Sequence, residues 1–155
     1  MPEAWMERAI QLAIDNVAHG QGGPFGAIVV RNGDLIATGA NMVTAANDPT
    51  AHAEVVAIRA ACQKLGSFQL SNCELYTSCE PCPMCLGAIY WARPERFYYA
   101  CTREGAALAG FDDAFIYNEV ALPPSHRSIP GIYVSAESGQ RPFEEWAKTA
   151  RKTTY

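Results

Sequence analysis

The segments His52-Ala53-Glu54 and Pro81-Cys82-Pro83-Met84-Cys85 decide the fold of this chain, because their side chains can act only when they meet at one site. His52, Cys82 and Cys85 offer one imidazole and two thiolates, which are common ligands of zinc. Three protein ligands leave the fourth tetrahedral position open, and a water molecule held there becomes a nucleophile near neutral pH. The two segments therefore predict a catalytic site with one zinc ion per chain.

The spacing within each segment predicts where its residues lie on a helix. Cys82 and Cys85 are three residues apart and a proline follows Cys82, so both sulfurs should lie on the same side of a first helical turn. His52 and Glu54 can reach one water molecule only from a first turn, with the metal beyond the helix end. We expect this helix to start near Asp48-Pro49-Thr50, and we expect Glu54 to carry protons.

Three simpler roles for these residues fit the sequence less well. A structural zinc site would need a fourth protein ligand, and neither Cys73 nor Cys79 forms the second close pair that such sites usually contain. A redox-active CxxC pair normally lacks prolines on both sides of its first cysteine. A single histidine is most often an ordinary core residue, but His52 stands beside Glu54 at a predicted helix start. The order H-x-E and then P-C-x-x-C is the signature of zinc nucleobase deaminases, which we therefore favour.

Length and composition indicate a single domain, residues 1–155, with its own hydrophobic core. The chain is 49% hydrophobic and has a net charge of -4, which argues against nucleic acid as a partner because that binding needs clustered lysine and arginine. No apolar run is long enough to cross a membrane, and the first residues do not resemble a secretion signal. We therefore expect a cytoplasmic protein with reduced cysteines and a small-molecule substrate.

Hydrophobic periodicity predicts strands and helices in alternation. The pair Asn32-Gly33 marks a hairpin turn between two antiparallel strands. From the second of these strands onward, strand, helix, strand, helix and strand follow in order, which implies parallel crossovers with helices on both faces of a sheet. The expected helices cover 3–18, 49–65, 83–92, 114–120 and a stretch from 142, and the expected strands cover 25–30, 35–39, 73–78, 97–101 and 129–134.

Two polar positions leave alternatives open. Asn41 ends a predicted strand, where asparagine either forms a turn or binds substrate. The pair Asp112-Asp113 is most often a solvated turn or a helix cap.

Longer motifs carry a resemblance to a known family. They are Gly23-Pro24-Phe25-Gly26-Ala27 and residues 47–54, 77–94 and 109–113, and the similarity extends to Tyr155. Over nearly its whole length the chain resembles the bacterial guanine deaminases of the cytidine deaminase-like superfamily. The H-A-E and P-C-x-M-C-x-G-A-I elements are shared with tRNA adenosine deaminases and yeast-type cytosine deaminases, whereas residues 90–94 and 110–113 indicate guanine more narrowly.

The resemblance implies a fold and a set of residue roles. The fold would be α/β, a three-layer αβα sandwich around a five-stranded mixed sheet. The protein would be a homodimer in which residues 137–155 swap to cover the partner's site. Glu54 and Asp113 would be catalytic, with Asp113 contacting the base or helping the amine to leave. The purine would also be contacted by Phe25, Asn41, Ala53, Trp91 and Tyr155, with Tyr155 closing the pocket.

We therefore predict hydrolytic deamination of guanine to xanthine and ammonia. The closest alternative is the same reaction on guanosine, cytosine, a triazine or adenosine in tRNA, because the sequence does not give the size of the pocket. An alternative of another class is a non-catalytic domain with a structural zinc ion, which would release ammonia from no base.

Overall fold

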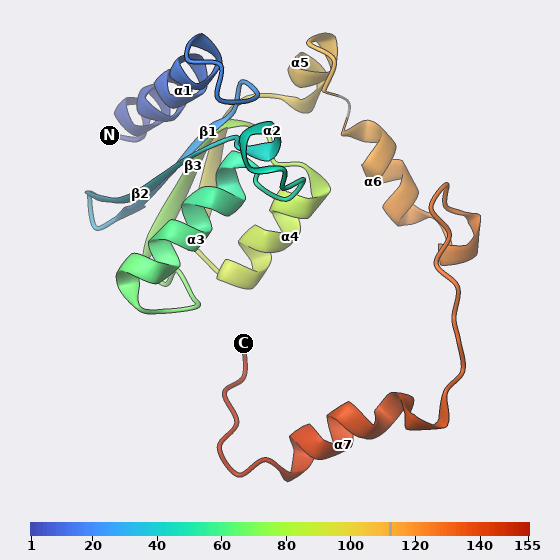
Figure 1. Cartoon of the computed structure of the whole chain (residues 1–155). Coiled ribbons are helices and arrows are strands. Elements are labelled where there is room, and N and C mark those ends of the chain that lie inside the picture. Colours follow the sequence, from blue (N-terminus) through green and yellow to red (C-terminus); the bar gives the residue numbers. More distant parts are fainter. Residues whose placement is uncertain (112) are drawn as a thin grey trace.

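The computed structural model describes residues 1–111 and 113–155, and a four-stranded mixed sheet lies at its centre (Figure 1). The strands are β1 (Gly26–Arg31), β2 (Asp34–Ala40), β3 (Cys73–Cys79) and β4 (Arg96–Cys101), in the order β2-β1-β3-β4. β1 is antiparallel to β2 and to β3, whereas β3 and β4 are parallel. β2, β3 and β4 therefore run in one direction, as the alternation of strands and helices predicts.

Helices cover both faces of this sheet (Figure 1). α1 (Pro2–Ala18) packs on one face, and α3 (Ala53–Leu65) and α4 (Pro83–Ala92) pack on the other. The expected three-layer αβα sandwich is thus confirmed. Among the helices of the described residues, none is long and apolar enough to cross a membrane. The shorter helices are α2 (Val43–Ala46), α5 (Arg103–Leu108), α6 (Ala114–Ala121) and α7 (Arg141–Lys148), together with 3₁₀ turns at Pro124–His126 and Glu137–Gln140.

Strand β1 contributes to both halves of the core because its side chains alternate between the two faces of the sheet. Ala27 and Val29 are buried beneath α3 and α4, whereas Ile28 and Val30 are buried beneath α1. This two-sided burial explains why the strand is apolar at nearly every position. The turn after it is the predicted one, because Asn32 and Gly33 both have the positive φ angles, 53° and 81°, that a two-residue hairpin loop requires.

Helix α3 begins later than the sequence suggests. It starts at Ala53 rather than near Pro49, because His52 has an extended backbone (φ -68°, ψ 154°) and is the N-cap. The segment before it is a turn, in which the Asp48 carboxylate accepts a hydrogen bond of 2.8 Å from the Thr50 backbone N–H. Because α3 starts at Ala53 rather than near Pro49, His52 lies at the N-terminal end of the helix and not inside it.

The expected strand at 129–134 is absent from the described sheet, which has four strands rather than five. This segment follows α6 and lies apart from β4 (Figure 1), and Ile129 and Tyr133 are 86% and 89% exposed. An extended segment becomes a strand only when a neighbour satisfies its backbone hydrogen bonds. β4 is therefore an edge strand in the single chain.

Gly39 in β2 allows α3 to approach the sheet closely. A Cβ atom at this position would overlap the carbonyl oxygen of Ala53 and would lie 2.5 Å from the backbone nitrogen of Ala57. Because Ala53 follows His52, the contact also fixes where the helix carrying the first zinc ligand begins.

We predict that Gly39→Ala lowers the free energy of unfolding by about 1–3 kcal/mol, because a close-packed interface accepts an added methyl group poorly. Urea denaturation would measure the change. Gly87→Ala is the matched control, since no atom lies within 4 Å of the added Cβ in α4, and it should be neutral or stabilising by up to about 1 kcal/mol. Equal destabilisation by both substitutions would contradict the close-packing explanation.

Candidate metal centre

The N-termini of α3 and α4 meet at one site. His52 is the N-cap of α3 and Cys82 is the N-cap of α4, and both have extended backbone angles. Cys85 lies in the first turn of α4, and its backbone N–H donates a hydrogen bond of 3.5 Å to the Cys82 sulfur. This cap places the two sulfurs on one side of the turn, as their spacing predicts.

The three side chains have the separations that a tetrahedral zinc ion requires. The Nδ1 atom of His52 is 3.6 Å from the Cys82 sulfur and 3.5 Å from the Cys85 sulfur. Zinc bonds of about 2.0–2.1 Å to nitrogen and about 2.3 Å to sulfur separate such atoms by about 3.6 Å. Among the described residues, the candidate metal-binding cluster consists of these three. Cys79 directs its sulfur to the carbonyl oxygen of Thr102 instead (3.9 Å), which does not support a four-ligand structural site.

The electrostatics of the cluster favour a thiolate at Cys82 and a neutral thiol at Cys85, because the hydrogen bond with Cys82 and burial raise the pKa of Cys85. A hydrogen bond to Cys82 raises the pKa of His52. The pKa of Cys82 is lowered by its interaction with the Cys85 side chain and then by His52 and the Cys85 backbone N–H. Cys82 is therefore ready to bind a cation at neutral pH. Zinc requires neutral His52 and two thiolates, so binding must release protons and must weaken as the pH falls.

Glu54 is a buried carboxylate beside the metal ligands and is not one of them. Its side chain is 6% exposed, its Oε2 atom accepts a hydrogen bond of 3.4 Å from the Cys85 thiol, and its Oε1 atom accepts one of 3.3 Å from the Thr77 hydroxyl. Burial raises the pKa of Glu54. A carboxyl group whose pKa is raised towards neutrality can both take and return a proton.

A cavity of about 580 Å³ opens onto this cluster and brings together most of the predicted site residues. Its lining includes Glu54, Phe25, Asn41 and Asp113, in addition to two of the metal ligands. The Asn41 side-chain oxygen accepts hydrogen bonds from backbone N–H groups of Val43 (3.2 Å) and Gly23 (3.4 Å). Asn41 therefore links the backbone at Gly23 to the backbone at Val43, and its side-chain amide nitrogen can donate a hydrogen bond to a ligand.

Three of the expected substrate contacts lie elsewhere in the single chain. Trp91 is on the outer side of α4 and its ring lies 5.7 Å from that of Tyr155, at a different cavity. The two rings are 62% and 72% exposed. Ala53 is fully buried in the core under the sheet, so only its backbone can face a ligand. Asp112, part of the predicted aspartate pair, lies outside the described residues.

Phe111 and Glu80 are among the cavity-lining residues to which the sequence analysis assigns no role. Phe111 packs edge-on against Phe25, with ring centroids 4.9 Å apart. Glu80 precedes the Pro81-Cys82 pair and faces the same cavity. The position of Phe111 beside the aspartates was the available signal for it, whereas Glu80 has the sequence context of an ordinary loop residue.

Comparison with known proteins agrees with this geometry. The family model described as the cytidine and deoxycytidylate deaminase zinc-binding region matches residues 1–101. The guanine deaminase of Bacillus subtilis is 55% identical over 153 residues, which are 99% of this chain and 98% of that protein. Its X-ray structure superposes with a TM-score of 0.97 over the same shares of the two chains.

More distant relatives match smaller shares of the chain. The tRNA-specific adenosine deaminase of Aquifex aeolicus is 32% identical over 130 residues, covering 83% of this chain and 82% of the relative. A solved structure in complex with 2,6-diaminopurine is 39% identical, with a TM-score of 0.69 over 73% of this chain and 63% of that chain. From the ligand geometry, the family match and the full-length relative together, we conclude that this chain belongs to the cytidine and deoxycytidylate deaminase zinc-binding family.

Proposed function

We propose that this protein is a guanine deaminase, which hydrolyses guanine to xanthine and ammonia. The observation that carries the chemistry is the buried Glu54 carboxylate beside a three-ligand metal cluster that opens into a cavity. The choice of guanine is supported by the 55% identity to a guanine deaminase across 99% of this chain. The net charge of -4 weighs against tRNA as the substrate.

The zinc ligands, Glu54 and Thr77 have separate roles in this reaction. Zinc held by His52, Cys82 and Cys85 would lower the pKa of a water molecule, so that it loses a proton near neutral pH and becomes a nucleophile. Glu54 takes a proton from the attacking water and delivers protons to a ring nitrogen and to the departing amine at C2 of guanine. The Thr77 hydroxyl holds one carboxylate oxygen in place for these transfers.

The walls of the cavity hold the purine. Phe25 packs on the ring, and the Asn41 amide donates a hydrogen bond to a purine acceptor. The Asp113 carboxylate, at the N-cap of α6, accepts hydrogen bonds from purine N–H groups and from the departing amine. Free cysteines throughout the described residues are consistent with a cytoplasmic location, which we also propose.

We predict that the purified, zinc-replete protein releases ammonia from guanine and not from guanosine, adenine or cytosine offered separately. Glu54→Gln should lower kcat by about 10³-fold because the proton carrier is lost, while the zinc content is unchanged. Ammonia release and metal analysis would measure both. Release from another base alone would refute guanine but keep the zinc chemistry, and full activity of Glu54→Gln would refute the mechanism.

We predict that Asp113→Asn lowers kcat/KM for guanine by about 10- to 100-fold, because a charged hydrogen-bond acceptor is replaced by a neutral amide. Steady-state kinetics would separate two roles. A loss in kcat indicates that Asp113 assists the departing amine, whereas a rise in KM alone indicates binding of the base. An unchanged kcat/KM would exclude both.

We infer a homodimer in which residues 137–155 pack on the partner subunit. α7 buries none of its residues, and Phe143 and Trp146 are 68% and 44% exposed. Figure 1 shows this helix lying apart from the sheet. A helix with one apolar face is stable when that face is covered. The apolar cavity of about 780 Å³ between α1, β4 and α5 is a suitable surface for it.

The same homodimer would also give a partner to the exposed segment 129–134 and to the Trp91 and Tyr155 side chains. The exposed segment 129–134 would pair with the free edge of the partner's β4 as the fifth strand. Trp91 and Tyr155, which lie away from the cavity of their own chain, would then reach the partner's cavity. Each active site would thus combine Glu54 of one subunit with Tyr155 of the other.

We predict that two inactive variants restore activity when mixed. Glu54→Gln and Tyr155→Ala homodimers should both be impaired, but each heterodimer would contain one site with both native residues. Co-expression at equal levels should therefore give about a quarter of the wild-type activity. The measurement is ammonia release by the whole co-expressed pool, and heterodimers isolated through two different tags should give about half of the wild-type activity. No gain over the single variants would show that the site is built from one chain.

A further inference from the structure

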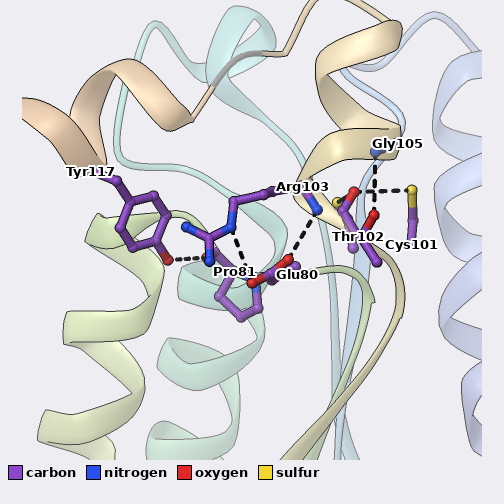
Figure 2. Close-up of polar contacts among 8 residues, drawn as sticks. Glu80, Pro81, Cys101, Thr102, Arg103, Gly105 and Tyr117 are labelled. Atoms are coloured by element: carbon purple, nitrogen blue, oxygen red, sulfur yellow. Dashed lines mark hydrogen bonds and ion pairs between the residues drawn. The ribbon is translucent and has the colours of Figure 1, made fainter.

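A network of polar contacts joins Glu80 and Pro81 to α5 and α6 (Figure 2), and the proposed reaction does not use it. Glu80 precedes the Pro81-Cys82 pair and is half-buried at the cavity wall. One of its carboxylate oxygens accepts a hydrogen bond of 3.0 Å from the Arg103 backbone N–H, and the other lies 3.3 Å from the Arg103 Nε atom. Both oxygens are engaged by Arg103 at the start of α5, so Glu80 serves this contact rather than the substrate.

The network continues from α5 to α6. The guanidinium carbon of Arg103 lies 4.3 Å from the centre of the Tyr117 ring, which is a cation–π distance. The Tyr117 hydroxyl donates a hydrogen bond of 3.0 Å to the carbonyl oxygen of Pro81 (Figure 2). The chain of contacts therefore leaves the zinc-ligand loop at Glu80 and returns to it at Pro81, the residue before Cys82.

The network reaches Asp113 through the backbone of α6. The Tyr117 backbone N–H donates a hydrogen bond of 3.1 Å to the Asp113 carbonyl oxygen, one helical turn away. α6 buries none of its residues, so apolar packing contributes little to its orientation. Tyr117 is half-buried and contacts the ligand loop directly. The position of Asp113 over the cavity thus depends on where Tyr117 is anchored.

We propose that Glu80, Arg103 and Tyr117 are positioning residues that hold Asp113 at a fixed place relative to the zinc ligand Cys82. This inference rests on the proposed function, because it uses the role of Asp113 in guanine deamination. None of the three belongs to the metal-binding cluster, and of the three Glu80 alone lines the cavity, with both carboxylate oxygens turned to Arg103. They link two walls of the cavity that are far apart in sequence, Pro81-Cys82 on one side and the start of α6 on the other.

Tyr117→Phe tests the link, because it removes the hydrogen bond to Pro81 and keeps the ring over Arg103. We expect kcat/KM to fall about five- to tenfold with unchanged zinc content, and amide hydrogen exchange in α6 to become faster. Tyr76→Phe is the matched control. It removes a hydrogen bond of 2.8 Å between the Tyr76 hydroxyl and Glu74, which does not line the cavity, and it should leave kcat/KM within twofold of wild type.

A double-mutant cycle with Asp113→Asn separates positioning from general stability. If Tyr117 acts through Asp113, Tyr117→Phe should change kcat/KM less than twofold in the Asp113→Asn background. Equal losses in both backgrounds, or unchanged exchange in α6, would overturn the proposal. If the wild type deaminates a different base, that base is used in the same cycle. If the wild type deaminates none, the proposed function fails while hydrogen exchange still decides whether Tyr117 anchors α6.

Discussion

The meeting of the two helix N-termini, with His52 Nδ1 3.5–3.6 Å from both sulfurs, is the constraint on which the rest of the structure depends. It requires α3 and α4 to lie on the same face of the sheet and to begin at the same edge. The strands before them, β2 and β3, must then run in one direction, which they do because β1 lies antiparallel between them. Gly39 completes the arrangement by letting α3 lie directly against β2.

This arrangement places polar groups where burial is costly. Glu54 is buried at 6% exposure, and Cys82 and Cys85 are buried with it. Isolated charges at such positions destabilise a fold unless hydrogen bonds, helix N-termini or a cation compensate them. Thr77 and the Cys85 backbone N–H provide part of the compensation, and zinc would provide the rest. Metal binding should therefore stabilise the folded chain as well as supply chemistry.

Local rules explain which parts could be predicted from the sequence. The spacing of Cys82 and Cys85 fixed their shared turn, and Asn32-Gly33 fixed the hairpin, because both depend on a few neighbouring dihedral angles. The late start of α3 depends on His52 acting as N-cap, which no propensity signals. Residues 129–134 have strand character but no partner in the described part of the chain, and pairing is a tertiary property. Trp91 and Tyr155 likewise meet each other and not the zinc site.

The family match and the full-length relative divide the chain at the end of β4. The family model ends at residue 101 and already contains the metal ligands, Glu54 and the sheet that positions them. The similarity to the Bacillus subtilis guanine deaminase continues to 99% of the chain. Phe111, Asp113 and Tyr155 all lie in this second part, which forms short, exposed helices with little core of its own. On the function proposed above, the part up to β4 would supply the zinc chemistry together with Phe25 and Asn41, and the part after β4 would add Phe111 and Asp113 to the walls of the same cavity.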